Sequence, residues 1–286
     1  MDKIKVCIIG AGGTTGYKIS RNLAKHPDQY ELSVCEVNPA AVEKLKLEGF
    51  NVKATEDAVP SADIVVPAIN DSKLKSFTPG VVKAMKSGAS MIILDPASVV
   101  AGEIPQREDC TLAICHPCHP SAFRDQDTPE ARADKWGGDG AKMDLVMSKI
   151  CGDDESFALC RRICEVMFEP VVKSFVMTPR QMAFLEPTLV EVLGATCLMA
   201  MAETLEEAVR RGIDREAATS FLCGHLQNVA FTFVGLLGDT KVSDACKVAV
   251  NVGNRLVLRD DWKRIWDDDI LDRVILTMLH PEDPKI

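Results

Sequence analysis

Basic residues are outnumbered in this chain of 286 residues. Lysine and arginine total 33 against 42 aspartates and glutamates, which gives a formal net charge of −9. Nucleic acids select proteins with basic faces, so we expect no nucleic-acid partner. A small anionic substrate stays compatible with this charge, because a few local cations are enough to bind one.

A long uninterrupted apolar run is also missing. The first run, Val6–Ile9, is too short for a signal peptide. The least polar later stretch, Val192–Ala202, falls short of the ~18 residues that a membrane span needs. We therefore expect a cytoplasmic protein with no membrane association. In a reducing compartment, most of its 11 scattered cysteines should be small buried apolar residues.

Residues 1–123 alternate short apolar runs with helix-like segments. The runs are Lys5–Ile9, Glu31–Glu36, Val52–Thr55, Asp63–Ile69, Met91–Asp95 and Leu112–Cys115, and the segments between them are Thr15–Lys25, Pro39–Glu48 and Lys73–Met85. Buried strands separated by helical crossovers are typical of a parallel sheet with helices on both faces. The fold class predicted is therefore α/β, with a doubly wound Rossmann domain over residues 1–123.

Residues 124–178 are expected to link this domain to a second one. Arg124–Gly140 is polar and glycine-rich, which predicts a loop. A helix near Asp154–Met167 follows, and then a strand over Val171–Val176 that can extend the sheet at one edge.

Residues 179–286 are predicted to form an all-α domain. A long helix over Met182–Arg211 is rich in Leu, Ala and Met, and a helix that is apolar most of the way round is usually buried. A second subunit is the expected cover, so we predict a homodimer through the long helix. Further helices are expected over Arg215–Leu237, Lys241–Leu256 and Asp267–Leu279.

A glycine-rich turn follows the first apolar run and opens a helix. It contains Gly10, Gly12, Gly13, Thr14, Thr15 and Gly16, which departs from strict G-x-G-x-x-G spacing by one residue. Such glycines allow a tight turn, admit a pyrophosphate close to the backbone and let the helix pack on the strand. This context predicts a dinucleotide site.

Glu36 ends the second apolar run, twenty residues after Gly16. A carboxylate there binds ribose hydroxyls and repels a 2′-phosphate, so NAD is favoured over NADP. Ile69 and Asn70 end a later run and are expected to border the cofactor, although ordinary turn chemistry explains them equally well.

The string Cys115-His116-Pro117-Cys118-His119-Pro120 ends the sixth predicted strand. A haem attachment site, a Cys115–Cys118 redox pair and a zinc site shared with Cys160 and Cys164 are all less favoured alternatives. We prefer a histidine that points into the crevice of the sheet. There His116 or His119 can act as a general base or bind a metal.

The Gly10–Gly16 turn and the order of Rossmann domain, linking strand and long helix resemble the 6-phosphogluconate dehydrogenase-like superfamily. Glu203-Thr204 and Gly212-Ile213-Asp214 look like landmarks of its hydroxyacid dehydrogenases. The resemblance implies a catalytic Lys and Asn on the long helix, but Pro187 and Val190 occupy those positions. A plain hydroxyacid dehydrogenase mechanism is therefore in doubt.

Glu186 stands beside this gap, among Phe184, Leu185 and Leu189. A carboxylate in apolar surroundings is expensive to bury unpaired. A divalent metal, zinc by preference, held by His116 and Glu186 would offset that cost and replace the missing lysine as electrophile. Arg124 and Arg180 are candidate partners for a substrate carboxylate.

The His116–Pro120 segment and Glu186-Pro187 resemble the superfamily branch with a phosphogluconate-dehydrogenase-type C-terminal domain. This resemblance implies NAD-linked oxidation of a branched sugar acid, coupled to isomerisation by migration of its carboxylate. His116, His119 and Glu186 are then the candidate catalytic residues. Two alternatives stay open: a metal-free NAD-dependent hydroxyacid dehydrogenase with His116 as base, and a non-enzymatic NAD(H) sensor.

Overall fold

The computed structural model describes residues 2–286. The chain divides into two compact units, one of residues 1–184 with 272–286 and one of residues 185–271. The first unit is larger than the predicted domain of residues 1–123. It also takes in two further strands and the C-terminal segment.

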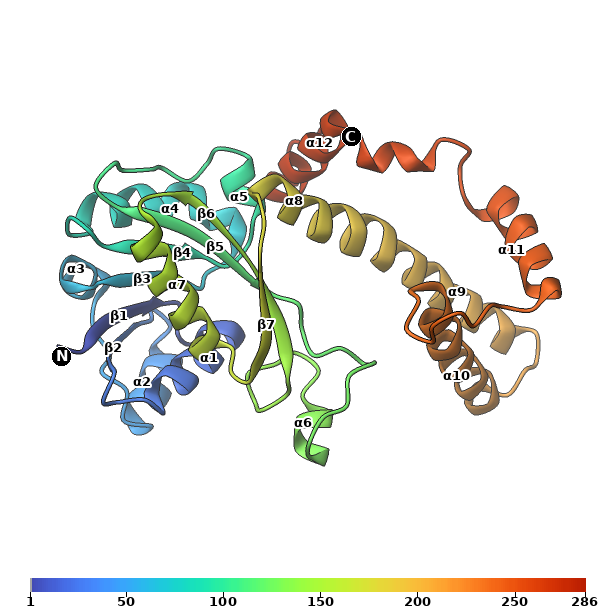
Figure 1. Cartoon of the computed structure of the whole chain (residues 1–286), viewed down its shortest axis with the longest axis horizontal. Coiled ribbons are helices and arrows are strands. Elements are labelled where there is room, and N and C mark those ends of the chain that lie inside the picture. The colour runs from blue at the N-terminus through green and yellow to red at the C-terminus, as the bar shows by residue number, and fades with distance from the viewer. Residues whose placement is uncertain (1) are drawn as a thin grey trace. The chain divides into compact units, whose positions relative to one another are not determined.

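The first unit is built on a seven-stranded sheet with the order β2-β1-β3-β4-β5-β6-β7 (Figure 1). The strands are β1 (Ile4–Ile9), β2 (Tyr30–Cys35), β3 (Ile64–Pro67), β4 (Ser90–Ile93), β5 (Thr111–Pro117), β6 (Met143–Cys151) and β7 (Val171–Val176). All neighbours pair in parallel except β5 and β6. This mostly parallel order confirms the predicted Rossmann-like fold.

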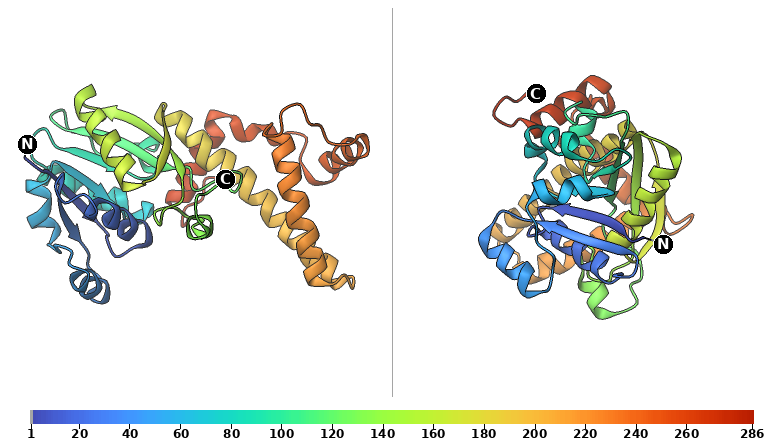
Figure 2. Two further views of the ribbon diagram at one scale, coloured as in Figure 1. Left: turned by 60° about the horizontal axis from the view of Figure 1, so that its bottom comes forward. Right: turned by 90° about the vertical axis from the view of Figure 1, so that its left-hand side faces the viewer.

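Helices cover both faces of the sheet (Figures 1 and 2). On one face α1 (Thr14–Ala24) and α7 (Asp154–Met167) pack with the strands around Ile8, Ile19 and Ile163. On the other face α3 (Thr55–Ala58), η1 (Val59–Ser61) and α4 (Asp71–Ala84) pack around Leu74 and Val81. The remaining helices that begin in or return to this unit are α2 (Pro39–Leu47), α5 (Ala97–Val100), α6 (Pro129–Ala133), α8 (Pro179–Ala183) and α12 (Asp268–Leu279).

Two strand predictions need correction. Val52 forms only an isolated bridge with Val34, because α3 begins at Thr55 and ends the extended segment. The histidine string therefore ends the fifth strand, not the sixth.

The strand β6 was not predicted, since Asp144 and Lys149 interrupt its apolar pattern. The predicted edge strand Val171–Val176 is confirmed, and β6 joins it to the sheet.

The second unit is helical. It contains the π-helical segment η2 (Phe184–Ala195, from Leu185 on), α9 (Thr196–Arg210), α10 (Arg215–Phe233), α11 (Asp244–Val257) and η3 (Trp262–Trp266). No residue of α9, α10 or α11 is buried. The start of the predicted long helix is buried at Met182, Ala183 and Pro187, and the cover of the remainder by a second subunit stays a prediction.

One helical stretch, Pro179–Arg210, is long and apolar enough to cross a membrane. This corrects the expectation drawn from Val192–Ala202, since a continuous helix tolerates the few acidic residues that interrupt the apolar run. Core helices of water-soluble proteins meet the same criterion, so the finding by itself assigns no membrane location.

Candidate active site

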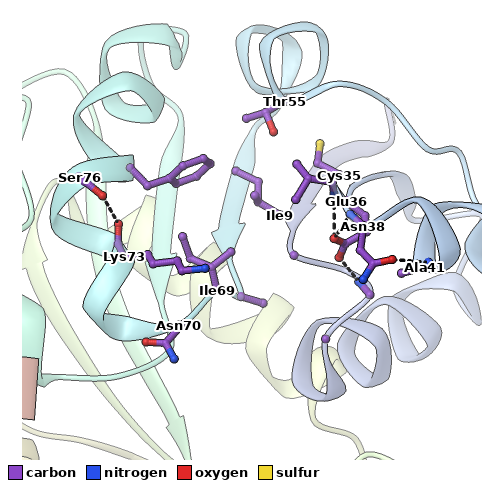
Figure 3. Close-up of a pocket in the computed structure, with 16 residues that line it drawn as sticks. Ile9, Cys35, Glu36, Asn38, Ala41, Thr55, Ile69, Asn70, Lys73 and Ser76 are labelled. Carbon is purple, nitrogen blue, oxygen red and sulfur yellow. Dashed lines mark hydrogen bonds between the residues drawn. The ribbon is translucent and has the colours of Figure 1, made fainter.

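A cavity of about 750 Å³ opens at the carboxyl ends of β1, β2 and β3. Figure 3 shows Glu36 and Asn38 on one side of it and Ile69 and Lys73 on the other. Ligands of open α/β sheets bind beyond the carboxyl ends of the strands. The cavity therefore lies where the sequence predicts the dinucleotide.

The glycine-rich turn lines this cavity and leads into α1. Gly10, Gly12 and Gly13 are lining residues. A Cβ on Gly16 would come within 2.2 Å of the Gly10 carbonyl oxygen, so only glycine allows the helix to start this close to the strand. Gly13 caps α1 without a side-chain hydrogen bond, which leaves the first backbone N–H groups of the helix to a ligand.

Three backbone N–H groups fix the side chain of Glu36. Its carboxylate accepts hydrogen bonds from the N–H groups of Gly12 at 2.8 Å, Val37 at 2.8 Å and Asn38 at 2.9 Å. Burial opposes ionisation of Glu36, but these donors together lower its pKa below the usual value. The ionised carboxylate keeps further lone pairs for ribose hydroxyls and opposes a second negative charge.

Asn70 both lines the cavity and forms the turn that begins α4, the two interpretations that the sequence left open. It lines the cavity, and its side-chain oxygen caps α4 by accepting hydrogen bonds from the N–H and hydroxyl of Ser72. Ile69 also lines the cavity. The first turns of α4 add Lys73 and Phe77, which the sequence analysis did not single out although they follow Asn70 at helical spacing.

His116 and Asp95 form a second group of polar side chains. His116 lies near the end of β5 and Asp95 follows the adjacent strand β4, and their ligand atoms lie within 4.8 Å of each other. His116 Nδ1 lies 2.8 Å from the Leu94 carbonyl oxygen. Because a carbonyl only accepts, Nδ1 is the donor and the lone pair of the neutral ring is on Nε2. Burial lowers the pKa of His116, which favours this neutral form.

The role of Asp95 was missed from the sequence, although the strand end was noted. The parallel pairing of β4 with β5, had it been known, would have placed Asp95 beside His116. Met91 to Ile93 of β4 pair in parallel with Leu112 to Ile114 of β5, so both strands end at one edge of the sheet. A carboxylate two residues beyond Ile93 and an imidazole two residues beyond Ile114 are then neighbours.

His119 lies in the loop after β5, with its ring edge-on to His116 at 6.2 Å between centroids. His119 Nδ1 lies 3.1 Å from the Trp136 carbonyl oxygen, so here too Nδ1 is the donor and Nε2 keeps the lone pair. A small cavity of about 70 Å³ is lined by His119 and Trp136 together with Thr14 and Thr15. The two threonines therefore lie on the side of the turn that faces the histidine loop.

The cysteine alternatives find no support in the structure. Cys115, Cys160 and Cys164 are buried. Burial raises the pKa of Cys160 to about 11 and holds the pKa of Cys164 well above its usual value, so these two thiols stay protonated. All three side chains act as apolar packing. Among residues 2–286 these thiols belong to no group of three metal-ligating side chains.

Both candidate arginines are already paired. Arg124 makes a two-pronged ion pair with Asp144 at 2.9 and 2.7 Å, and Arg180 pairs with Asp272. Glu186 is the second residue of the helical unit. Its approach to His116 stays a prediction.

Two family models divide the chain between them. Residues 1–127 match the NADPH-binding domain of acetohydroxy acid isomeroreductase, and residues 124–279 match the C-terminal domain of decarboxylating phosphogluconate dehydrogenase. The second match covers more than half of the chain and confirms the predicted resemblance.

Closer relatives cover the whole length. A D-apionate oxidoisomerase from Blautia hydrogenotrophica is 52% identical over 287 residues, which is all of both chains. One from Pectobacterium atrosepticum is 38% identical over 96% of this chain and 95% of its own. The chain belongs to the D-apionate oxidoisomerase family.

A solved structure agrees with this family assignment. A semialdehyde dehydrogenase NAD-binding protein from Cupriavidus necator, in complex with calcium and NAD, has a TM-score of 0.92 and 34% identity, over 97% of this chain and 100% of its own. The family and the cavity around Glu36 make the chain an NAD-dependent oxidoreductase. The NAD(H)-sensor alternative is therefore set aside.

Proposed function

We propose that the chain oxidises D-apionate with NAD⁺ and couples this oxidation to isomerisation of the sugar acid, with a divalent metal as electrophile. The pairing of Asp95 with His116 carries the proposal, because it sets a carboxylate and an imidazole at the same edge of the sheet as the dinucleotide cavity. β4 and β5 lie two and three strands from β1, which is roughly 10 and 14 Å. Relatives named D-apionate oxidoisomerase, 52% and 38% identical over 100% and 96% of this chain, support D-apionate as the substrate.

The residues around the cavity suit NAD and its chemistry. NAD⁺, when bound, would supply the hydride acceptor for the substrate carbon, so a residue of this chain must take the proton of the oxidised hydroxyl. Glu36 and the Gly10–Gly13 turn hold the adenosine side. His119, with its lone pair on Nε2, is the proposed acceptor of that proton.

The metal is proposed to bind His116 and Glu186, as expected from the sequence, with Asp95 as a third ligand. Glu186 follows Ala183, which is buried in the first unit, by only three residues, so their Cα atoms are at most roughly 11 Å apart. The helix α8 that ends at Ala183 packs against α5 and β6, and α5 begins two residues after Asp95. Chain connectivity thus favours an approach of Glu186 to Asp95.

The donor set fits a divalent cation. One imidazole and two carboxylates leave room for water or substrate oxygens, and zinc accepts such mixed ligands. A bound metal lowers the pKa of a coordinated hydroxyl and polarises a carbonyl. The calcium in the Cupriavidus necator relative supports a cation site in this family, and zinc stays our proposal for this chain.

The test is an assay of NAD⁺ reduction at 340 nm with D-apionate, with the product identified by NMR. A linear aldonic acid of equal charge is the control substrate. We expect turnover of D-apionate alone, a rearranged carbon skeleton in the product and loss of activity after dialysis against a chelator. Oxidation without rearrangement that survives chelation would instead support the metal-free dehydrogenase.

We further propose that the chain is a cytoplasmic homodimer joined through the helical unit. Within the chain, α9, α10 and α11 contain no buried residue. A cavity of about 770 Å³ between α9 and α10 has a mostly apolar lining that includes Met201, Leu205 and Phe221. Apolar surface of this extent is usually covered in solution, so a second copy of the chain is the proposed cover.

A further inference from the structure

The segment between α6 and β6 is fastened to the dinucleotide-binding helix α1. Lys18 of α1 donates a hydrogen bond to the Gly137 carbonyl oxygen at 2.7 Å. The same ammonium group lies 3.4 Å from Asp134 and 3.2 Å from Asp139. The side chains of Lys18 and Asp134 are only 18% and 5% exposed, so solvent screens this pair far less than a surface ion pair.

Asp134 stabilises the conformation of this segment through hydrogen bonds to its backbone. Its two carboxylate oxygens accept hydrogen bonds from the N–H groups of Gly137 at 2.9 Å and Asp139 at 2.8 Å. Burial opposes its ionisation, but the N–H of Asp139, the charge of Lys18 and the N–H of Gly137 lower its pKa below the usual value. Residues 134–139 are thus a compact turn. Lys18 binds its more buried part, Asp134 and the Gly137 carbonyl, and Arg21 binds only Asp139 at its exposed end.

This turn carries the peptide group that orients His119. The Trp136 carbonyl accepts the hydrogen bond from His119 Nδ1, and the neighbouring Gly137 carbonyl accepts the one from Lys18. The indole of Trp136 meets the imidazole edge-on at 5.5 Å. His119 also has a φ of +53°, which is unfavourable for a residue other than glycine and needs surrounding contacts to persist.

We propose that Lys18 is a positioning residue for His119. Through Gly137 and Trp136 it holds the imidazole with its proton on Nδ1 and its lone pair on Nε2, the state in which His119 can accept a proton. Lys18 follows Thr14 on α1 by about one turn. The helix that begins at the predicted dinucleotide site therefore also orients the His119 side chain. The inference rests on the proposed function in one respect, the role of His119 in proton transfer.

The experiment compares Lys18→Met with Lys18→Arg, with Arg21→Met as matched control. Arg21 is the neighbouring cation of α1, and it contacts Asp139 but not the Gly137 carbonyl. We expect Lys18→Met to lower kcat about tenfold, because an imidazole held less firmly spends less time in the orientation and tautomer that accept a proton. Lys18→Arg should recover part of this loss, Arg21→Met should change kcat less than about twofold, and all three should bind NADH as the wild type does.

The second readout is the tautomer of His119, observed at one fixed pH by NMR of ¹⁵N-histidine-labelled protein. The resonance is assigned with His119→Gln. The wild type and Arg21→Met should carry the proton on Nδ1, and Lys18→Met should show a mixture of tautomers.

The outcomes separate the two claims. An unchanged tautomer in Lys18→Met overturns the inference, even if His119→Gln abolishes activity and so supports the proposed function. A changed tautomer with unchanged kcat supports the positioning of His119 by Lys18 and removes the proposed role of His119 in the reaction.

Discussion

At the scale of single residues, Gly12 decides how Glu36 is presented to the coenzyme. A Cβ at this position would lie 2.6 Å from Glu36 Oε2 and 2.6 Å from Ala41 Cβ. We expect Gly12→Ala to displace the carboxylate and to weaken NADH binding at least tenfold, about 1.4 kcal/mol. Titration followed by NADH fluorescence measures this change.

The control for this variant is Gly80→Ala in α4, where an added Cβ meets nothing within 4 Å. Alanine favours helix over glycine, so this variant should fold at least as stably as the wild type and bind NADH equally well. Equal NADH affinity in Gly12→Ala and the wild type would show that Glu36 does not hold the ribose as described.

The sequence predicts the site only in part. Gly10, Gly12, Gly13, Glu36, Ile69 and Asn70 line one cavity, because a strand, a glycine turn and a helix follow one another locally along the chain. Their contact with the dinucleotide stays a prediction. The roles of Asp95 and Lys18 depend on which strands and loops become neighbours. Hydrophobic periodicity does not report such long-range pairing.

At the scale of elements, local patterns predict most helices and strands. The helix Asp154–Met167 and the strand Val171–Val176 have the predicted bounds, since a capping aspartate and turn residues mark their ends. The strand β6 was not predicted from the sequence because polar residues interrupt its apolar pattern. Its backbone pairing with β5 and β7 stabilises it as a strand nevertheless. Tertiary pairing here decides what local propensity leaves open.

The segment after α12 is tied to the sheet unit by Glu103. Its carboxylate, 7% exposed, accepts hydrogen bonds from Lys75 at 2.8 Å and from His280 Nε2 at 2.6 Å. Burial opposes its ionisation, but these two partners lower its pKa below the usual value. We expect Glu103→Gln to reduce the free energy of unfolding at pH 7.5 by about 1 to 3 kcal/mol.

The contribution of Glu103 to the free energy of unfolding should decrease as the pH falls. A carboxyl whose pKa is lower in the folded state stabilises the fold fully above its ordinary pKa, near 4.3, and loses this contribution as pH falls through the folded value. In urea unfolding, the difference in the free energy of unfolding between Glu103→Gln and the wild type should therefore be smaller at pH 3 than at pH 7.5. Glu282→Gln, which alters an exposed partner of the same histidine, should stay within about 0.5 kcal/mol of the wild type at both.

At the scale of the whole molecule, the uncovered helices predict the assembly. Light scattering at micromolar concentration should give about twice the chain mass of 31.2 kDa. Phe221→Asp, in the apolar cavity of the helical unit, should yield monomers, because a carboxylate is costly to bury in an interface. Leu47→Asp, on an exposed apolar residue of α2, should leave the dimer intact.

Two results would contradict this assembly. The wild type could elute as a monomer with unchanged activity, or it could float with phospholipid vesicles. The second result would assign the apolar helix Pro179–Arg210 to a membrane surface.

The central claim concerns His116 and Glu186, and metal analysis of purified variants tests it most directly. We predict about one zinc ion per chain in the wild type and in His26→Gln, whose histidine pairs with Glu169 away from the site. His116→Gln and Glu186→Gln should both lose the metal while still binding NADH. Equal metal content in all four proteins, or none in any, would contradict the account.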